Sequence, residues 1–220
     1  MIHIITQENA HLYGDIMPSM YRLRYHAFIE RQGYNVSSIR NMEYDSYDTP
    51  AAVYLVWREE IGKIGGCTRI TPTDRPYMIE QLWPDLVGNE GLPHAHNIWE
   101  ASRFCIDKGL PKEKRRQIHI ALLCAMQEFC IAQNIEFMIG VMQPRIWLRI
   151  FISLGWPIEY LGSIKQLANR EEIVAGRMPI SFEILHRLRS QSNLPAPAIR
   201  NPLQHPLLQV VYDESLSYQI

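Results

Sequence analysis

The fold is decided by a strand-like run in the middle of the chain, Ile98-Trp99-Glu100-Ala101-Ser102-Arg103-Phe104-Cys105-Ile106-Asp107. Successive side chains of a strand point to opposite faces of the sheet. The expected faces carry Glu100, Ser102 and Phe104 on one side, and Trp99, Ala101, Arg103 and Cys105 on the other. Burying a carboxylate or a guanidinium without a partner is costly, so Glu100 and Arg103 are expected to meet opposite charges or a polar ligand.

Composition indicates one globular domain. The chain has 220 residues, of which 47% are hydrophobic and 20% charged, which suits one substantial core and is too short for two. We expect a domain over residues 1–190, followed by a proline-rich C-terminal extension over 191–220. The formal net charge of -1 favours neither a nucleic-acid partner nor binding to a membrane surface.

Cysteine and histidine usage predicts no metal site. Four cysteines lie in apolar contexts without the spacing of metal ligands, so buried free thiols are expected at Cys67, Cys105, Cys124 and Cys130. His94 and His96 are spaced like a metal pair, but no third ligand is in view and a loop role is favoured. The first apolar run is too short for a signal peptide, and none approaches the roughly 20 apolar residues of a membrane span. We therefore expect a cytoplasmic protein.

The periodicity of apolar residues predicts alternating strands and helices. Strands are expected at 2–5, 52–58, 63–70, 98–107, 136–142, 158–161 and 180–185. Helices are expected at 12–31, 77–82, 112–133 and 146–154, with a long polar and aromatic loop at 33–49. This order predicts an α/β protein, a single-domain α-β-α sandwich around a mixed sheet.

Five segments in the first half of the chain occur in the order and spacing of one known family: residues 21–30, 43–48, 66–73, 76–78 and 99–104. In these segments the chain resembles the acyl-homoserine-lactone synthases, or autoinducer synthases, of bacterial quorum sensing. The resemblance implies a fold similar to the N-acetyltransferases (GNAT-like) and an acyltransferase that uses S-adenosylmethionine (SAM) and an acyl thioester. The thioester would be carried by acyl carrier protein or coenzyme A (CoA). SAM would be a substrate, so no cofactor is expected.

The implied reaction has two steps. The amine of SAM attacks the thioester carbonyl, and the SAM carboxylate then displaces methylthioadenosine to close the lactone. Holding a zwitterionic amino acid requires carboxylates near its ammonium, arginine near its carboxylate, and aromatic rings near its adenine and sulfonium. The resemblance assigns SAM binding to Arg24, Phe28, Tyr34, Asp45, Asp48 and Arg69. Tyr34 stands where the family usually has tryptophan, which keeps an aromatic face.

The SAM-binding assignments have plainer alternatives. Arg24 and Phe28 are one helical turn apart and share a face, but an isolated pair of this kind is as often a surface cation and a core ring. Asp45 and Asp48 can hold the ammonium, pair with an arginine, or form a turn. Glu43, at the start of the same motif, is expected to be solvated.

The catalytic candidates are Glu100, Ser102 and Arg103. Glu100 is the candidate general base, because an ammonium must lose a proton before it attacks and a partly buried carboxylate can be tuned to the working pH. The alternative is a structural ion pair with Arg69 or Arg103. Ser102 can hydrogen-bond the substrate or the neighbouring strand, and Arg103 can clamp a carboxylate or a group near the thioester. Backbone N–H groups along or beside the strand are expected to bind the oxyanion.

Two further sets concern the acyl donor. The acyl chain is expected against Met126, Met138, Val141, Met142 and Trp147, which are equally consistent with ordinary core. Family members that prefer 3-oxo chains carry threonine or serine at the position of Val141, so an unsubstituted chain is favoured. Donor docking is assigned to Lys112, Lys114, Arg115, Arg116, Arg145 and Arg149. Residues 112–116 suit CoA phosphates, Arg145 and Arg149 suit an acidic carrier protein, and a solvated basic face is the alternative.

Two other functions compete with this interpretation. One is a plain N-acyltransferase that acts on another amine, and the other is a sensor that binds an acyl thioester or SAM without turnover. The first would not need the SAM-binding set around Arg24 and Asp45. The second would not need Glu100 together with Ser102 and Arg103.

Overall fold

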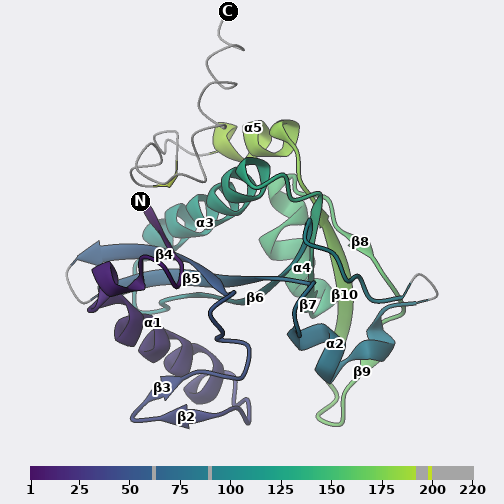
Figure 1. Cartoon of the computed structure of the whole chain (residues 1–220), viewed down its shortest axis with the longest axis horizontal. Coiled ribbons are helices and arrows are strands. Elements are labelled where there is room, and N and C mark those ends of the chain that lie inside the picture. Colours follow the sequence, from purple (N-terminus) through teal and green to yellow (C-terminus); the bar gives the residue numbers. More distant parts are fainter. Residues whose placement is uncertain (61–62, 89–90, 192–197, 200–220) are drawn as a thin grey trace, which may run out of the picture.

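A mixed β-sheet forms the centre of the computed structural model, which describes residues 1–60, 63–88, 91–191 and 198–199 (Figure 1). Within these residues the path across the sheet is β1 (Ile2–Ile5), β4 (Val53–Glu60), β5 (Lys63–Pro72), β6 (Ile98–Ile106), β7 (Phe137–Met142), β10 (Glu172–Pro179) and β8 (Glu159–Tyr160). Strand β9 (Lys165–Gln166) also pairs with β10. Neighbouring strands are antiparallel except β6 and β7, which are parallel. This is the predicted mixed sheet.

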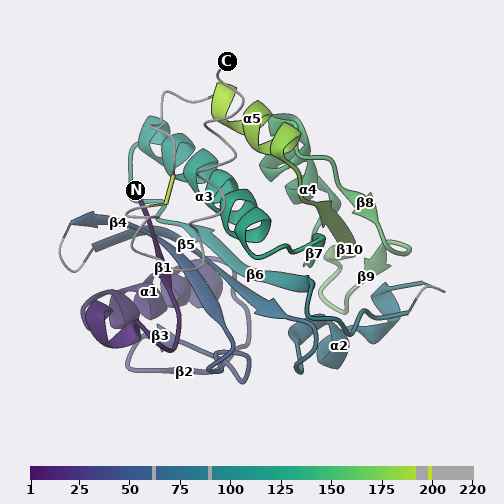
Figure 2. The ribbon, with the colours of Figure 1, turned by 45° about the horizontal axis from the view of Figure 1, so that its top comes forward.

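Helices cover both faces of the sheet (Figures 1 and 2). One face carries α3 (Lys112–Ala132), α4 (Pro144–Ile150), the 3-10 helix η4 (Ile152–Leu154) and α5 (Phe182–Ser190). The other carries η1 (Ala10–Tyr13), α1 (Ile16–Arg24), its π-helical continuation η2 (Tyr25–Glu30), and a hairpin of β2 (Ser38–Ile39) and β3 (Met42–Glu43). Helices α2 (Met78–Leu82) and η3 (Pro84–Leu86) lie beside β7 and β10 on this second face. The predicted α-β-α sandwich is confirmed.

Helix α3 supplies much of the core on its face. Five of its apolar side chains at helical spacing are buried: Ile118, Leu122, Ala125, Met126 and Phe129. Full burial of an aliphatic or aromatic side chain of this size contributes about 1.5–3 kcal/mol relative to exposure. The long helix therefore anchors the strands that carry the site described below.

The first helical segment differs from the single helix expected over 12–31. Pro18 is the third residue of α1, and a proline ring clashes with the carbonyl four residues before it. An α-helix that contains Pro18 therefore cannot extend back to Leu12, and the chain forms the separate helix η1 first. After Arg24 the helix continues as π-turns over Tyr25–Glu30, a geometry that often occurs at functional sites.

The strand expected at 180–185 is wrong. Strand β10, which the sequence analysis missed, ends at Pro179, and the chain then enters α5. The hydroxyl of Ser181 caps this helix by accepting a hydrogen bond from the Ile184 N–H at 3.2 Å. Ile184, Leu185 and Leu188 are buried at helical spacing. The other expected strands are confirmed to within two residues at each end.

Three residues of the expected C-terminal extension are described, and two of them, Ala198 and Ile199, dock on the domain. Ile199 forms a parallel bridge with Ile2. The buried carboxylate of Glu128, in α3, accepts hydrogen bonds from the N–H groups of Ala198 and Ile199 at 3.1 and 3.2 Å. Residues 192–197 and 200–220, the rest of the expected extension, lie outside the described residues.

The four cysteines are buried and free, as predicted. Cys67 and Cys105 lie opposite each other on β5 and β6, with their sulfur atoms 3.5 Å apart. No helix in the described part of the chain is long and apolar enough to cross a membrane.

Candidate active site

An ion-pair network of three arginines and three carboxylates lies on the α1 side of the sheet. Its members are Arg24, Glu43, Asp45, Asp48, Arg69 and Arg103. They come from the end of α1, from β3 and the loop that follows it, and from β5 and β6. The formal charges of the six cancel. This balance suits burial, because a buried ion is tolerated only when a partner compensates it.

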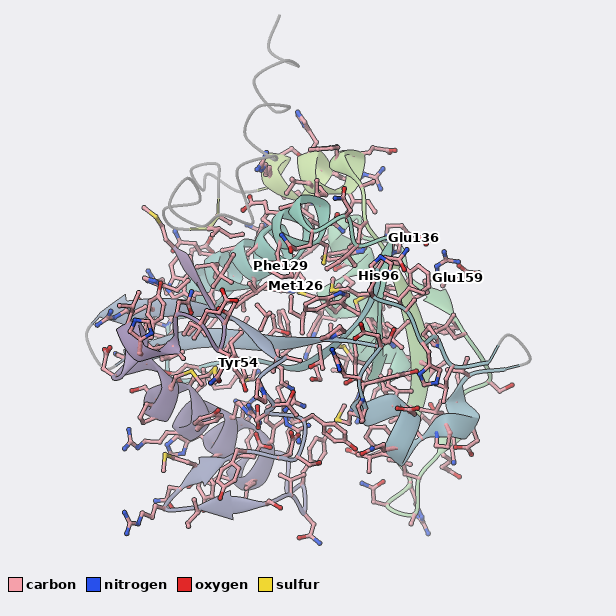
Figure 3. The ribbon with its side chains drawn as sticks, in the orientation of Figure 1. Tyr54, His96, Met126, Phe129, Glu136 and Glu159 are labelled. Carbon is pink, nitrogen blue, oxygen red and sulfur yellow. The ribbon has the colours of Figure 1, made fainter. Side chains whose placement is uncertain are left out.

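Arg24 is held by Glu43 and Asp48. Its Nε donates to Glu43 Oε2 at 2.6 Å, and its terminal nitrogens donate to both oxygens of Asp48 at 2.7 and 2.8 Å. The Tyr54 hydroxyl also donates to Asp48, at 2.8 Å, and Figure 3 shows Tyr54 on this side of the sheet. Burial raises the pKa of Asp48, but the bonds and charge of Arg24 outweigh it and hold that pKa well below its usual range. Arg24 is 0% exposed, so it is not a surface cation.

Arg69 and Arg103 share Asp45. Arg69 donates to the two oxygens of Asp45 at 2.5 and 3.1 Å, and its Nε donates to the Ser102 hydroxyl at 3.0 Å. Arg103 approaches Asp45 at 2.7 Å and donates from Nε to Glu43 Oε1 at 3.0 Å. Ser102 therefore orients Arg69, and Asp45 lies between two guanidinium groups.

The expectation of a solvated Glu43 is wrong. Its side chain is 0% exposed and bridges Arg24 and Arg103. The β2–β3 hairpin, which ends at Glu43, places this carboxylate against the end of α1. No local sequence pattern indicates that Glu43 bridges two arginines, because Arg24 and Arg103 lie 19 and 60 residues away in the sequence.

A β-bulge in β6 changes the side on which Arg103 lies. Between two flanking pairs, Cys67 with Cys105 and Arg69 with Ser102, β6 contains one residue more than β5. Arg103 has a φ of 54°, in the left-handed region that side chains other than glycine rarely adopt. Such strain persists only where the surroundings impose it, and it clusters at functional sites. Here the surroundings are the two carboxylates that bind Arg103.

The bulge overturns the alternation expected for the second half of β6. Arg103 joins Glu100 on the α1 side, and so does Cys105, which packs in the cluster under α1. Phe104 packs on the α3 side, with its ring 5.8 Å from that of His119. The expected faces of residues 103–105 are therefore wrong, because strict alternation assumes equal numbers of residues in the two strands.

Glu100 is buried and binds the start of α2. Its Oε1 accepts a hydrogen bond from the Ile79 N–H at 2.7 Å, and its Oε2 accepts one from the Met78 N–H at 3.1 Å. In the described part of the chain Glu100 forms no ion pair with Arg69 or Arg103, the alternative considered above. Burial raises the pKa of Glu100 to about 7, against the lowering effect of the two backbone hydrogen bonds. A carboxylate with this pKa can accept a proton near neutral pH.

Aromatic rings surround the network. The rings of Phe28 and Tyr34 are stacked, with centroids 6.3 Å apart, and the Arg103 guanidinium lies 5.4 Å from the Phe28 centroid. The ring of Tyr47 lies 5.8 Å from the guanidinium of Arg69. Phe28 and Tyr34 belong to the set predicted from the sequence, whereas Tyr47 does not, although it stands between Asp45 and Asp48.

Strands β6 and β7 pair over only part of their length. The parallel ladder covers three residue pairs, from Ile98 with Phe137 to Glu100 with Ile139, although β6 continues to Ile106 and β7 to Met142. Figure 1 shows the two strands diverging beyond the ladder. Backbone groups on the facing edges no longer pair with each other there, so they are able to bind a molecule that enters between the strands.

The five residues expected to line the acyl chain do not lie together. Met126, Met138, Met142 and Trp147 pack on the α3 side, and Figure 3 shows Met126 there. Val141 packs on the opposite face, in the cluster beside α2. The cause is the alternation along β7, which separates Val141 from Met138 and Met142.

Trp147 covers a pair of glycines. Gly140 of β7 and Gly176 of β10 are directly opposite each other. A Cβ atom added at either glycine would lie 3.2 or 3.0 Å from the Trp147 ring. The Trp147 Nε1 donates to the Val174 carbonyl at 3.2 Å, and the side chain is 0% exposed. The two glycines therefore leave the space that the indole ring fills, next to the point where β6 and β7 diverge.

The basic residues expected to dock the donor have different surroundings. Lys114 interacts within the domain, 3.3 Å from Glu59 and over the ring of Trp57. Arg145 is exposed and donates to the Gln143 side chain at 2.7 Å. Lys112 and Arg116 are exposed at the start of α3.

Arg115 and Arg149 instead belong to a basic cluster with two residues that the sequence analysis did not select, Arg31 and Lys108. Lys108 is exposed, but partial desolvation, and then repulsion from Arg31, Arg115 and Arg149, lowers its pKa. The Nε of Arg115 is buried and has no hydrogen-bond partner among the described residues. The cluster lies beside the N-terminus of α3, where backbone N–H groups also favour anions.

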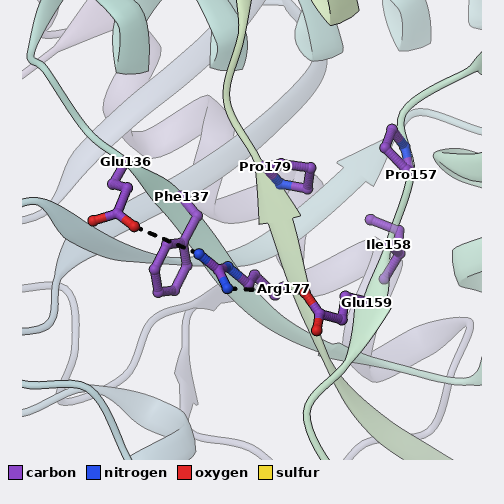
Figure 4. Close-up of a pocket in the computed structure, with 7 residues that line it drawn as sticks. All are labelled: Glu136, Phe137, Pro157, Ile158, Glu159, Arg177 and Pro179. Atoms are coloured by element: carbon purple, nitrogen blue, oxygen red, sulfur yellow. Dashed lines mark hydrogen bonds and ion pairs between the residues drawn. The ribbon is translucent and has the colours of Figure 1, made fainter.

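A separate surface hollow of about 270 Å³ lies where β7, β10 and β8 meet (Figure 4). There the guanidinium of Arg177 lies 4.0 Å from the centroid of Phe137 and within 3.5 Å of Glu136 and 3.9 Å of Glu159. None of the lining residues belongs to the ion-pair network or to the expected site.

The sequence pattern of the autoinducer synthases matches residues 8–188. The chain belongs to the autoinducer synthase family. The matched span contains the ion-pair network, Glu100, the diverging strands and the basic cluster. The enzyme is thus an acyltransferase of the acyl-homoserine-lactone synthase type, as the resemblance implied.

Individual relatives and a solved structure are acyl-homoserine-lactone synthases, in agreement with the family match. The isovaleryl-homoserine lactone synthase of Bradyrhizobium diazoefficiens is 30% identical over 197 residues, which cover 89% of this chain and 87% of that protein. An acyl-homoserine-lactone synthase of Vibrio anguillarum is 42% identical over 166 residues, covering 74% and 86%. The CoA-dependent synthase BjaI, solved with SAM and isopentyl-CoA, superposes with a TM-score of 0.82 at 30% identity, covering 91% of this chain and 92% of that one.

A more distant structure supports the GNAT-like fold. An acyl-CoA N-acyltransferase from Pseudomonas aeruginosa has a TM-score of 0.54 at 12% identity, covering 80% of this chain and 97% of that one. This likeness shows a shared fold alone.

Proposed function

We propose that this synthase acylates the amine of SAM from an acyl thioester and closes the product to a homoserine lactone, with release of methylthioadenosine. The observation that carries the proposal is the position of the ion-pair network and Glu100, on one face of the sheet at the point where β6 and β7 diverge. A zwitterionic acceptor on that face would meet arginine, carboxylate and aromatic groups together. A thioester between the strands would then lie within reach of its amine.

Exposure divides the network into two parts. The side chains of Arg24, Glu43 and Arg69 are at most 1% exposed, whereas those of Arg103 and Asp45 are 12% and 13% exposed. We assign contact with SAM to the exposed pair, with Arg103 toward the carboxylate and Asp45 toward the ammonium. Arg24, Glu43, Asp48 and Arg69 would position that pair, and the Phe28–Tyr34 stack would receive the adenine or sulfonium.

Glu100 would act as the general base. With a pKa of about 7 it is partly ionised at neutral pH and able to take the proton that the ammonium must lose. Backbone N–H groups at the divergence of β6 and β7 would bind the oxyanion of the tetrahedral intermediate. After acyl transfer, Arg103 would hold the SAM carboxylate in line with the carbon that it attacks.

The α3 side of the sheet favours a donor that carries a short acyl chain. Trp147, seated over Gly140 and Gly176, meets any chain that extends past the divergence toward Met126 and Met138. The relative from Bradyrhizobium is named for a short, branched acyl group, which supports the same expectation.

CoA is the donor carrier that the basic cluster supports. Arg31, Arg115 and Arg149 each repel the Lys108 ammonium, and phosphates bound beside it would relieve that repulsion. Arg145 lies outside this set of repelling charges and provides a matched control. Because both substrates are made inside cells, the proposal also favours a cytoplasmic location.

The test is to incubate the purified enzyme with SAM and a series of acyl-CoA and acyl-carrier donors, and to detect lactone and methylthioadenosine by mass spectrometry. Lactone is expected from short acyl-CoA. Lys108→Glu should raise the KM for acyl-CoA several-fold, whereas Arg145→Glu should change it little. If no donor gives lactone, the proposed function fails. If only carrier-bound donors react, the CoA assignment fails.

A further inference from the structure

Thr71, near the end of β5, holds a buried hydroxyl that lacks a partner. The residue is 1% exposed, and its Oγ1 has no hydrogen-bond partner in the described part of the chain. Its neighbours on the same segment differ. Thr68 donates to the Ser102 carbonyl at 3.1 Å, and Thr73 donates to the Ile98 carbonyl at 2.9 Å. The unpaired hydroxyl is therefore a property of position 71 and not of this segment as a whole.

The hydroxyl lies on the face that carries the site. Thr71 is directly opposite Glu100 in the β5–β6 ladder, and opposed residues of an antiparallel pair point to the same face, with Cβ atoms about 4.5–5.5 Å apart. Arg69, two residues earlier on β5, shares this face and belongs to the ion-pair network. Thr71 thus lies beside the candidate base, on the side where the acceptor amine would be bound.

An unsatisfied hydroxyl opposes folding. Leaving a buried donor or acceptor unpaired costs roughly 1–3 kcal/mol, and valine would occupy nearly the same volume without that cost. A hydroxyl gains free energy at this position only when a polar group is brought to it. The carboxylate of Glu100 is already bound to two backbone N–H groups and is held at a fixed place across the ladder.

We propose that the Thr71 hydroxyl binds the reacting nitrogen of the acceptor, between β5 and Glu100. This inference rests on the proposed function and deepens it. The Thr71 oxygen accepts a hydrogen bond from one N–H of the ammonium, and Glu100 removes another proton, which leaves the nitrogen with the electron pair that forms the bond to the thioester carbon. The C–S bond then breaks, and the leaving thiolate takes up the proton that the acylated nitrogen loses. The hydroxyl itself neither gains nor loses a proton. Its role is to hold the nitrogen beside the base during this transfer.

The test compares Thr71→Val with Thr71→Ser and with Thr73→Val. Thr71→Val should keep or raise the melting temperature and lower kcat/KM for SAM about tenfold, which corresponds to one hydrogen bond. Thr71→Ser should restore most of the rate. Thr73→Val removes a satisfied hydroxyl that is equally buried, so it should lower the melting temperature.

Calorimetry with a SAM analogue in which hydrogen replaces the amino group distinguishes loss of amine binding from a general loss of affinity for SAM. Thr71→Val should weaken binding of SAM but leave binding of this analogue unchanged. Equal losses for both ligands, or wild-type kinetics in Thr71→Val, would overturn the inference. A wild-type enzyme that binds SAM but makes no lactone would refute the proposed function, and the two-ligand comparison would still decide the role of Thr71.

Discussion

The two faces of the sheet at the point where β6 and β7 diverge are organised by different forces. On the α1 side, directional bonds between oppositely charged groups fix each side chain, and Glu43, for example, joins two arginines from distant segments. On the α3 side, Trp147 and the methionines around it are fixed by volume. Charge pairs fail when one member is lost, whereas apolar packing adapts to changes in size. We call the α1 face the acceptor side and the α3 face the donor side. The acceptor side should therefore tolerate substitution poorly, whereas the donor side should adapt to it.

Of the substitutions that test this difference between the two sides, Arg24→Ala should have the largest effect. The substitution leaves Glu43 and Asp48 buried without their main partner, and loss of one member of a buried pair costs about 3–5 kcal/mol. We expect a fall of that size in the free energy of unfolding, measured by urea denaturation, together with loss of SAM use. Arg75→Ala is the control, because its pair with Asp74 is exposed and should contribute no more than about 1 kcal/mol. An Arg24→Ala variant as stable as this control would show that the network is not a structural unit.

Glu100→Gln probes catalysis on the same side. A positioned general base contributes on the order of 10²- to 10⁴-fold, so kcat should fall by that factor while SAM still binds. In the wild type, kcat/KM should rise with pH through about 7 as Glu100 ionises. Turnover at the wild-type rate in Glu100→Gln would remove Glu100 from the mechanism.

Stability should follow the opposite course with pH. The pKa of Glu100 is raised by burial from an unfolded value of 4.5 to about 7, so the folded protein binds the proton more tightly than the unfolded chain does. This stabilisation is fully present below pH 4.5 and is lost as the pH rises through 7, by at most about 3 kcal/mol. Urea denaturation of wild type and Glu100→Gln between pH 5 and pH 8 should show a difference that changes in this direction, and parallel curves would contradict it.

The sequence predicted the acceptor side better in its residue types than in its contacts. Glu100, Ser102 and Arg69 lie on one face, as alternation required. The face on which Arg103 lies could not be predicted, because one extra residue in β6 reverses the alternation of side chains. No glycine at this position indicates a left-handed φ. Glu43 could not be placed either, because its burial depends on how a hairpin meets a helix 19 residues earlier.

The donor side shows the complementary limit. An apolar run predicts burial but not the face or the element. Val141 therefore lies across the sheet from the residues that it was expected to join, and residues 182–185 of the expected strand belong to α5. The capping serine at 181 was a usable signal for the helix. The sequence pattern could not indicate Lys108, because the arginines that lower its pKa lie on other elements.

Trp147→Phe tests whether volume controls the donor side. The smaller ring should free space over Gly140 and Gly176, so the preferred acyl-CoA should become longer while the rate with the original donor falls by less than tenfold. Some stability should be lost, on the order of 1–3 kcal/mol. Trp156→Phe is the matched control, because Trp156 is equally buried and donates to the Pro179 carbonyl, away from the glycine pair. The same chain-length profile in both variants would show that Trp147 does not set the limit.

The smallest effect is expected from Val141→Thr. By analogy with family members that take 3-oxo chains, a hydroxyl at this position would be expected to favour such donors. The structure gives a different expectation, because Val141 packs beside α2, across the sheet from Met138, Met142 and Trp147. A threonine there would face the acceptor side, so the ratio of kcat/KM values for 3-oxo and unsubstituted donors of equal length should change by less than twofold. Competition between the two donors, read from the ratio of lactones by mass spectrometry, measures this directly. A clear shift toward the 3-oxo product would mean that the acyl chain crosses to the face of Val141, and the separation of the two sides would then be incomplete at the divergence of β6 and β7.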